Sequence, residues 1–432
     1  MSIDFVTRGR SVAPWTRLRN PGILATYGDS LAASLTIDTS LKQNYGATSP
    51  VNWAIMLNRG LFRLTAANNG NFGGSGQRTD EMLPRLQSVI ASGAGTVIIF
   101  AGTNDIALSY PTLGTSAQVA FSNVRKMVLA LIRAGIQVVI DLPLGSTSWS
   151  AAQIAQLYRY HQMLKEFVEK TPMVYIHDAS PMVLNAVGSA TAITFKANYF
   201  YDQTHPNGRG AYYWGKSLLA LLQQIIPPLP RITYLGLTDV RDLLYINNGL
   251  FTVQTGGTNN IGAALIGGAV PAGFTLYRTG NATVSLSYGT DDGTALDPSL
   301  GGKLIMACTF TAAGEVIRLQ QDLGITGVAP GRAFDLGCRA RVVSGMDSLC
   351  AARMHASVSV DGVSRDWYSL LEGASSHYGP DEAYQVDHMI TPRLEAGNVV
   401  NFVSARHFAV ARAAGTAVVE LARFGTRSRL AA

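Results

Sequence analysis

A serine, a histidine and a carboxylate occur in this sequence where they could perform nucleophilic catalysis together. Ser30 follows the apolar run ILATY at 23–27, and Asp202 precedes His205 by three residues. At this spacing a carboxylate can accept a hydrogen bond from the histidine Nδ1–H, which leaves Nε2 free to take a proton from a serine hydroxyl. Taken alone, Ser30 could equally be the N-cap of a helix after a tight turn.

Two further segments could supply hydrogen-bond donors for an oxyanion. The glycines of NFGGSG at 71–76 allow the backbone to approach a ligand closely, and GTND at 102–105 ends an apolar run with an amide side chain. Read in isolation, the first segment is a flexible loop and Asn104 is a turn residue. Both need a fold that brings them to Ser30 and His205.

Short apolar runs alternate with segments of helical period over residues 23–226. Near-continuous apolar strands separated by helices predict a parallel sheet covered on both faces, with ligands bound at the carboxyl ends of the strands. The four polar segments fall at those ends or just before the last helix, so we expect them to meet. The predicted strands are 23–27, 62–67, 96–102, 137–143 and 173–179, and the predicted helices are 50–59, 80–92, 115–134, 151–170 and 209–226.

In this order, GDS, NxGxSG, GTND and DxxHP resemble the four blocks of the SGNH hydrolase superfamily, also called GDSL-type esterases, over about residues 23–215. The resemblance implies a three-layer α/β/α domain with a five-stranded parallel sheet. It also implies a carboxylic ester hydrolase that needs no metal or organic cofactor. By position, Ser30 would be the nucleophile, His205 the general base and acid, and Asp202 the triad acid.

The resemblance also implies an oxyanion hole. Its donors would be the backbone N–H groups of Ser30 and Gly76 and the side chain of Asn104. The loop reads SGQRT rather than the shorter SGxT, so Gly73 or Gly74 could take the place of Gly76.

Residues beside the nucleophile and the base are candidates for substrate contacts. Asp29 precedes Ser30, and Tyr201 belongs to a group of aromatic residues near His205. These aromatic side chains could simply pack in the fold, or they could stack on sugar rings. The group is Tyr199, Phe200, Tyr201, Tyr212, Tyr213 and Trp214. The other two histidines of this half, His161 and His177, are predicted to be structural.

After residue 230 the sequence becomes rich in glycine and contains short runs in which apolar and polar residues alternate. Many short strands separated by turn residues predict an all-β sandwich or jelly roll. The predicted domains are an N-terminal arm at 1–22, the esterase domain at 23–230 and the β domain at 231–432, with the boundary near 228–245. The strands predicted in the last domain are 282–288, 303–310, 339–343, 356–360, 399–405 and 417–424.

Composition and charge exclude several classes of protein. Of 432 residues, 47% are hydrophobic and 14% charged, so the chain is not disordered. Residues 1–230 carry 18 basic and 11 acidic side chains, scattered rather than clustered, which is not a nucleic-acid footprint. The three cysteines, in no metal-binding spacing, allow one disulfide at most or three reduced thiols.

No apolar stretch of signal-peptide length opens the sequence, and no run of about 18 apolar residues occurs. We therefore expect no membrane span and synthesis in the cytosol, with an extracellular or virion-associated site of action left open. A glycine-rich β domain beside such an esterase weakly resembles the carbohydrate-binding jelly rolls of polysaccharide-active enzymes. The preferred hypothesis is O-deacetylation of a polysaccharide or glycoconjugate. The alternatives are a lipid or short-chain acyl esterase, and a phage-tail or surface glycan-binding adhesin that carries an esterase domain.

Overall fold

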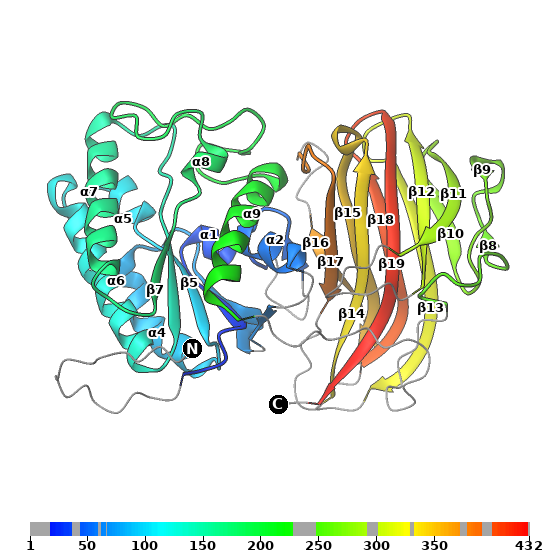
Figure 1. Cartoon of the computed structure of the whole chain (residues 1–432), viewed down its shortest axis with the longest axis horizontal. Helices are drawn as coiled ribbons and strands as arrows, with labels where there is room; N and C mark the ends of the chain where they lie inside the picture. Colours follow the sequence, from blue (N-terminus) through cyan, green and yellow to red (C-terminus); the bar gives the residue numbers. More distant parts are fainter. Residues whose placement is uncertain are drawn as a thin grey trace, which may run out of the picture.

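The computed structural model contains two units side by side, an α/β unit and an all-β unit (Figure 1). The structure describes residues 18–36, 44–58, 62–65, 67–227, 248–291, 301–328, 332–371, 378–390 and 400–430. The predicted domain boundary at 228–245 lies outside these residues, as does most of the predicted N-terminal arm.

A parallel sheet forms the centre of the α/β unit. Its strands follow the order β3–β1–β5–β6–β7, and β4 pairs with the end of β1. The five predicted strands correspond to β1, β3, β5, β6 and β7, whereas β4 was not predicted. The bounds are β1 (Ile23–Gly28), β3 (Arg63–Leu64), β4 (Asn71–Gly73), β5 (Thr96–Phe100), β6 (Gln137–Asp141) and β7 (Val174–His177).

Helices lie on both sides of this sheet, with α6 and α7 on one side and α2 and α9 on the other (Figure 1). Apolar residues recur along α6 at helical spacing, and these are the residues that it buries. All five predicted helices are present, and 80–92 is divided between α3 and α4. The bounds are α1 (Ser30–Ala33), α2 (Pro50–Leu57), α3 (Thr79–Met82), α4 (Leu86–Ala91), α5 (Thr103–Ala107), α6 (Ser116–Arg133), α7 (Ala151–Val168), α8 (Ser180–Val183) and α9 (Gly208–Ile225).

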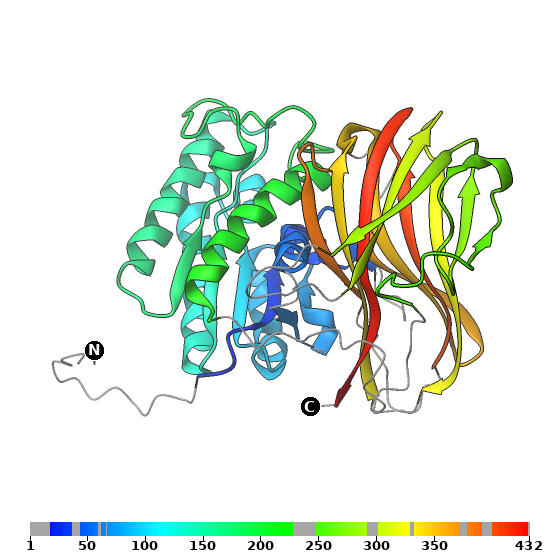
Figure 2. The same cartoon turned by 45° about the vertical axis from the view of Figure 1, so that its right-hand side comes forward.

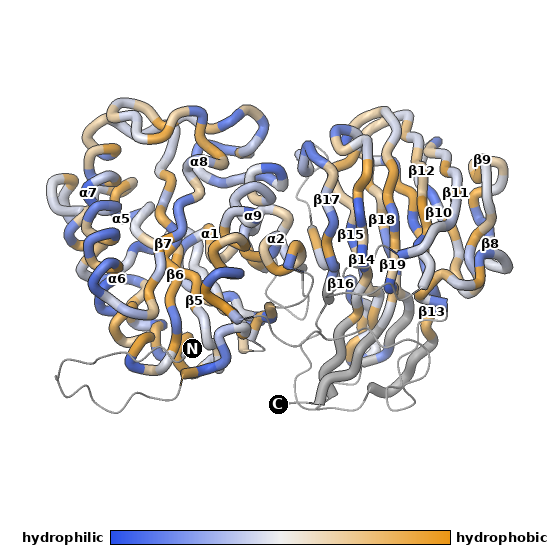
Figure 3. Tube along the Cα trace, in the orientation of Figure 1, coloured by the Kyte–Doolittle hydropathy of each residue, from blue (hydrophilic) through white to orange (hydrophobic). Residues whose placement is uncertain are grey.

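The all-β unit consists of two sheets that pack face to face as a β-sandwich (Figure 2). Most neighbouring strands are antiparallel, and among the described strands of this unit only the short strands β2, β8 and β9 join in parallel. Hydrophilic and hydrophobic residues alternate along the long strands, as period two requires (Figure 3).

One sheet follows the order β2 (Asn44–Gly46), β16 (Val363–Leu371), β15 (Leu349–Val360), β18 (Val400–Ala411), β13 (Val316–Val328), β10 (Thr275–Thr279) and β8 (Thr258–Asn259). The other follows β17 (Tyr384–Ile390), β14 (Arg332–Ser344), β19 (Gly415–Leu430), β12 (Gly302–Phe310), β11 (Thr283–Thr290) and β9 (Leu265–Gly267). The six predicted strands correspond to β11, β12, β14, β15, β18 and β19. The cysteines are buried and form no disulfide, which removes that alternative.

The two units share a sheet edge and part of a hydrophobic core. Strand β2 comes from the first half of the chain but pairs with β16 of the sandwich. On α2, Trp53 is buried and packs edge-on against Tyr212 of α9 and Tyr384 of β17. The units therefore cannot separate without exposing apolar side chains of both.

Polar contacts continue this interface at the start of α9. The Arg209 side chain donates to the Gly379 carbonyl at 3.0 Å and to Asp347 at 2.9 Å. One turn further on, the Tyr212 hydroxyl donates to Glu382 at 2.6 Å. The helix that follows the predicted catalytic histidine is thus attached to the sandwich.

Two histidines lie in the sandwich core, His388 on β17 and His407 on β18, with their rings 5.9 Å apart. His388 Nδ1 is 2.9 Å from Ser369 Oγ, whereas neither ring nitrogen of His407 has a partner among the described residues. Burial lowers the pKa of His388 to about 4. Burial, and then the nearby positive charge of His388 and Arg353, places the pKa of His407 well below 6.5.

We expect acid to destabilise the fold through these histidines. Their unfolded pKa is about 6.5, so the neutral histidines contribute fully above that pH, and their contribution is lost as pH falls towards the depressed folded values. His388 alone should lose about 2 kcal/mol between about pH 7.5 and 5. In urea unfolding at stepped pH, His407→Leu should lose less stability over this interval than the wild type. Equal losses would contradict this account.

Candidate active site

Ser30 lies at the carboxyl edge of the parallel sheet, where β1 ends beside β5. The turn requires glycine, because Gly28 has φ +152° and a Cβ there would lie 1.9 Å from the Phe100 carbonyl oxygen. The Asp29 N–H then donates to the same carbonyl at 3.0 Å. This contact ends β1 and makes Ser30 the first residue of α1.

Asp202 and His205 lie in a tight turn before α9. The chain closes on itself because the Tyr201 N–H donates to the His205 carbonyl at 3.1 Å. Asn207 then caps α9, accepting from the N–H groups of Arg209 and Gly210. The turn is therefore fixed by its own backbone and by the helix that follows it.

The three predicted triad side chains form one chain of hydrogen bonds. Ser30 Oγ is 2.8 Å from His205 Nε2, and His205 Nδ1 is 2.8 Å from Asp202 Oδ2. A carboxylate can only accept, so Nδ1 carries the proton and Nε2 of the neutral ring accepts from the Ser30 hydroxyl. The His205 side chain is 28% exposed, which leaves the site open to a ligand.

Asp202 is held in its charged form. Partial burial acts to raise its pKa, but hydrogen bonds from the His205 backbone N–H, the His205 ring and the Thr204 N–H outweigh this and leave the pKa below its ordinary value. The two backbone bonds are short, at 2.6 and 2.7 Å. Asp202 therefore stays an acceptor for the imidazole at neutral pH.

The loop after β4 offers one uncommitted glycine N–H. The Gly73 N–H donates to Asn71 Oδ1 and the Gly74 N–H to the Gly28 carbonyl, both at 2.9 Å. Within the described part of the chain, the backbone N–H groups of Gly76 and Ser30 have no hydrogen-bond partner. This difference favours Gly76 among the three candidate glycines.

Asn104 lies beside this loop, because its Nδ2 donates to the Gln77 carbonyl at 2.9 Å and keeps a second N–H. The next residue, Asp105, is buried and accepts from the Thr79 backbone N–H at 3.0 Å and from its hydroxyl at 2.6 Å. Asp105 and Thr79 thus join α3, which follows the glycine loop, to α5. Their role was not predicted, because the sequence gives no sign that residues 26 positions apart are bonded.

Asp29 does not fit its predicted role as a substrate contact. It is 1% exposed, and its Oδ1 accepts from the Leu31 N–H at 3.0 Å as the N-cap of α1. Burial raises its pKa to about 7, although the bond from Leu31 acts in the other direction. Asp29 therefore positions the helix that carries Ser30.

Tyr201 does lie at the surface next to the base. It is 52% exposed, and its ring is stacked on that of His205 with centroids 5.8 Å apart. The other aromatic residues divide differently, since Tyr212 and Trp214 are buried in the two cores. The predicted aromatic platform is thus reduced at the surface chiefly to Tyr201.

A second Ser–His–Asp set lies inside the α/β unit. It lacks the access and the oxyanion donors that are found around Ser30. His177 Nδ1 is 2.7 Å from Asp141, and its Nε2 is 2.9 Å from Ser217 Oγ. The Ser217 hydroxyl donates to the Trp214 carbonyl of its own helix. His177 and Asp141 are buried, and the N–H groups inside a helix are already bonded, so no oxyanion donor is available. This set joins β6, β7 and α9.

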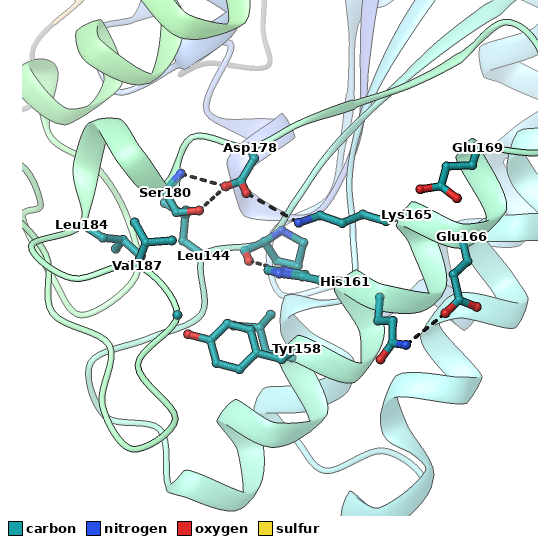
Figure 4. A pocket seen from close by; sticks show the side chains of 14 residues that line it. Leu144, Tyr158, His161, Lys165, Glu166, Glu169, Asp178, Ser180, Leu184 and Val187 are labelled. Carbon is teal, nitrogen blue, oxygen red and sulfur yellow. Dashed lines mark hydrogen bonds and ion pairs between the residues drawn. The ribbon is translucent and has the colours of Figure 1, made fainter.

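A cavity of about 460 Å³ lies between α7 and the chain that follows β7 (Figure 4). Its wall includes His161, whose Nε2–H donates to the Pro143 carbonyl at 2.9 Å and whose pKa burial lowers to about 4. Lys165 and Asp178 also line it and form an ion pair at 4.0 Å (Figure 4). None of Ser30, Asp202 and His205 lines this cavity.

Over the described ranges, no group of three or more His, Cys, Asp or Glu side chains could hold a metal ion. None of the described helices combines the length and the apolar character that crossing a membrane requires.

Residues 26–212 match the family described as GDSL-like Lipase/Acylhydrolase. Three solved structures show the extent of structural similarity. A protein described as lipolytic and of the G-D-S-L family, from Desulfitobacterium hafniense, has 17% identity and a TM-score of 0.36, covering 46% of this chain and 99% of that one. An acetyl-xylooligosaccharide esterase from Geobacillus has 17% identity and a TM-score of 0.36, covering 48% and 96%. A GDSL-like lipase from Bacteroides thetaiotaomicron has 20% identity and a TM-score of 0.33, covering 48% and 88%.

No curated protein matches the chain by sequence. The family match spans the strands, loops and turn that carry Ser30, Asn104 and His205. Residues 26–212 therefore form a GDSL-like lipase/acylhydrolase (SGNH) domain, and this match supports an esterase in general.

Proposed function

We propose that this protein is a serine esterase that uses Ser30, His205 and Asp202 to remove O-acetyl groups from a polysaccharide or glycoconjugate. The observation that carries the catalytic part is the unbroken chain of hydrogen bonds from Ser30 Oγ through the His205 ring to Asp202. Because the family match supports an esterase in general, these roles and the substrate are the specific content of the proposal.

In the first step, His205 Nε2 takes the hydroxyl proton of Ser30 while Oγ attacks the ester carbonyl. Asp202 accepts from Nδ1–H, which holds the ring in the required tautomer and stabilises the imidazolium that forms. His205 then returns the proton to the leaving alcohol. Water, activated by the same ring, releases the acyl group from Ser30.

The negative charge on the tetrahedral oxygen needs preorganised donors. The uncommitted backbone N–H groups of Ser30 and Gly76 and the second Nδ2–H of Asn104 are suited to this task. Mutagenesis of such donors in other enzymes costs about 2.7 to 4 kcal/mol each. Asp105 and Thr79 would help to hold Gly76 and Asn104 in position relative to each other, because they bond α3, which follows the glycine loop, to α5.

The carbohydrate part of the proposal rests on Tyr201 and on the sandwich. An exposed aromatic ring beside the base can stack on a sugar ring. The eight strands β12 to β19 are divided equally between the two sheets. In one sheet they lie in the order β17–β14–β19–β12, and in the other in the order β16–β15–β18–β13. This arrangement supports a jelly roll of eight strands. A β-sandwich of this kind beside the site favours a large glycan over a free lipid as the substrate.

The catalytic serine is tested by Ser30→Ala, with Ser217→Ala as the matched control. Loss of the nucleophile should lower kcat/KM for p-nitrophenyl acetate by at least about 10³-fold. Ser217 has the same kind of partners but no oxyanion donors, so its variant should stay within about threefold of the wild type. Unchanged turnover by Ser30→Ala would rule out the assignment.

Asp202→Asn tests the orienting role of the carboxylate. The amide can donate to Nδ1 and so favours the wrong tautomer, and kcat should fall by about 10²- to 10⁴-fold while KM changes far less. Asp178→Asn is the control, because Asp178 also lies next to a histidine in the sequence but contacts Lys165 and Ser180. A larger effect from the control than from Asp202→Asn would show that the triad acid is misassigned.

Substrate class is tested by acyl-chain length and by polymer. We expect acetate release from an O-acetylated polysaccharide, and kcat/KM for p-nitrophenyl esters that decreases from acetyl to decanoyl. The readouts are free acetate by coupled assay and p-nitrophenol by absorbance. A preference for decanoyl would favour the lipid alternative, and turnover of small esters without any polymer would favour the short-chain alternative.

A further inference from the structure

The outer face of the seven-stranded sheet carries an unusual set of side chains. Alternate residues of β15, β18 and β13, such as Met354, Ala405 and Leu319, are buried in the sandwich core, so their neighbours point outward. We call this outward surface the arginine face. Its principal side chains are Tyr277, Arg318, Gln320, Asp322, Arg353, His355, Ser357, Asp366, Tyr368, Ser404, Arg406 and Phe408.

These side chains form rows across the strands. One row runs Tyr277, Arg318, Phe408, Arg353 through directly paired positions on β10, β13, β18 and β15. The next row contains Gln320, Arg406, His355 and Tyr368. Paired positions on adjacent strands lie about 5 Å apart, so the guanidinium groups of Arg318, Arg353 and Arg406 share one patch.

Aromatic rings support the guanidinium groups. Arg318 lies over the Tyr277 ring at 4.1 Å, and Arg353 lies over the Tyr368 ring at 4.8 Å. Stacking of this kind holds the guanidinium plane, and at Arg318 it leaves the N–H edges of the group available. Such planar donors match the two oxygens of a carboxylate.

The arginines of the opposite sheet behave differently and serve as an internal comparison. On that outer face Arg339 pairs with Asp387 at 2.9 Å, and Arg423 pairs with Asp291 at 2.6 Å. In contrast, over the described ranges neither Arg318 nor Arg406 forms an ion pair. Burial and then the charge of Arg406 lower the pKa of Arg318, which indicates crowded positive charge.

The arginine face also contains unmet hydrogen-bonding capacity. Ser404 and His355 are 0% and 2% exposed, yet Ser404 Oγ and His355 Nδ1 have no partner among the described residues. Gln320 Oε1, in the same patch, also has no partner among the described residues. Buried polar atoms of this kind usually have a partner, and three on one face indicate a polar ligand.

From the unpaired arginines we propose that the arginine face binds an acidic polysaccharide through its carboxylate groups. This inference rests on the proposed function and deepens it by naming the class of polysaccharide. The charge is complementary to uronate residues, while hydroxyl groups of the sugars suit the remaining polar side chains. Asp322 and Asp366 also lie within the patch, where carboxylate oxygens can accept from sugar hydroxyl groups.

The test measures binding of the full-length protein to polygalacturonate by titration calorimetry. The control ligand is the same polymer with its carboxylates methyl-esterified, which has the same sugar without the charge. We expect affinity for the charged polymer to exceed that for the ester at least about tenfold, and to fall as salt rises. The methyl esters of the control polymer are themselves carboxylic esters, so the titrations of both polymers are also made with Ser30→Ala, which keeps the result independent of the esterase reaction.

The double variant R318Q/R406Q should weaken polygalacturonate binding by about tenfold or more, because each charge-assisted hydrogen bond contributes substantially to the binding free energy. R339Q is not a suitable control, since it would leave Asp387 buried without its partner. Arg341 is 42% exposed on the opposite face, so R341Q is the matched variant and should bind within about twofold of the wild type. Hydrolysis of p-nitrophenyl acetate should be unchanged in both.

Several outcomes would overturn the inference. These are equal affinity for charged and esterified polymers, equal effects of R318Q/R406Q and R341Q, or tighter binding of a DNA duplex with the same arginine dependence. A change in oligomeric state by light scattering in R318Q/R406Q would make the face a subunit interface instead. If R318Q/R406Q fails to fold, binding by R406K and the salt dependence of wild-type binding test the proposal instead. Binding that does not depend on salt would count against it.

Discussion

The hydrogen bond between Ser30 Oγ and His205 Nε2 joins residues 175 positions apart, and the rest of the α/β unit serves to make it possible. A bond of 2.8 Å tolerates little movement of either side chain, so both ends must be fixed independently. Gly28 fixes one end, because only glycine lets β1 finish against the Phe100 carbonyl. The short turn at 199–207, capped by Asn207, fixes the other end.

That second end depends on α9, and α9 depends in turn on the sandwich. The helix is bonded to β6 and β7 through Trp214, Asp141 and His177 on one side. On its other side, Arg209 and Tyr212 bond to the sandwich. The all-β unit is therefore part of the support for the histidine turn.

The two Ser–His–Asp sets illustrate why residue types alone do not define a catalytic site. Both have imidazole-to-carboxylate and imidazole-to-hydroxyl distances of 2.7 to 2.9 Å. They differ in surroundings, since Ser30 begins a helix with a free N–H and lies by a glycine loop, whereas Ser217 lies inside a helix and donates to its own backbone. Access and vacant donors, rather than the triad distances, distinguish Ser30 from Ser217.

The sequence by itself determined the order and type of most elements, because the spacing of apolar residues and the positions of turn residues are local properties of the chain. It placed the five main strands and five helices, and it predicted Ser30, His205 and Asp202 as a triad from short segments whose chemistry is complementary. It could not determine partners across long separations. The β2–β16 pairing, the Asp105–Thr79 bonds, the burial of Asp29 and the difference between paired and unpaired arginines all arise from packing between distant segments. Only the tertiary structure decides these, since a side chain's exposure and charge environment depend on which residues fold against it.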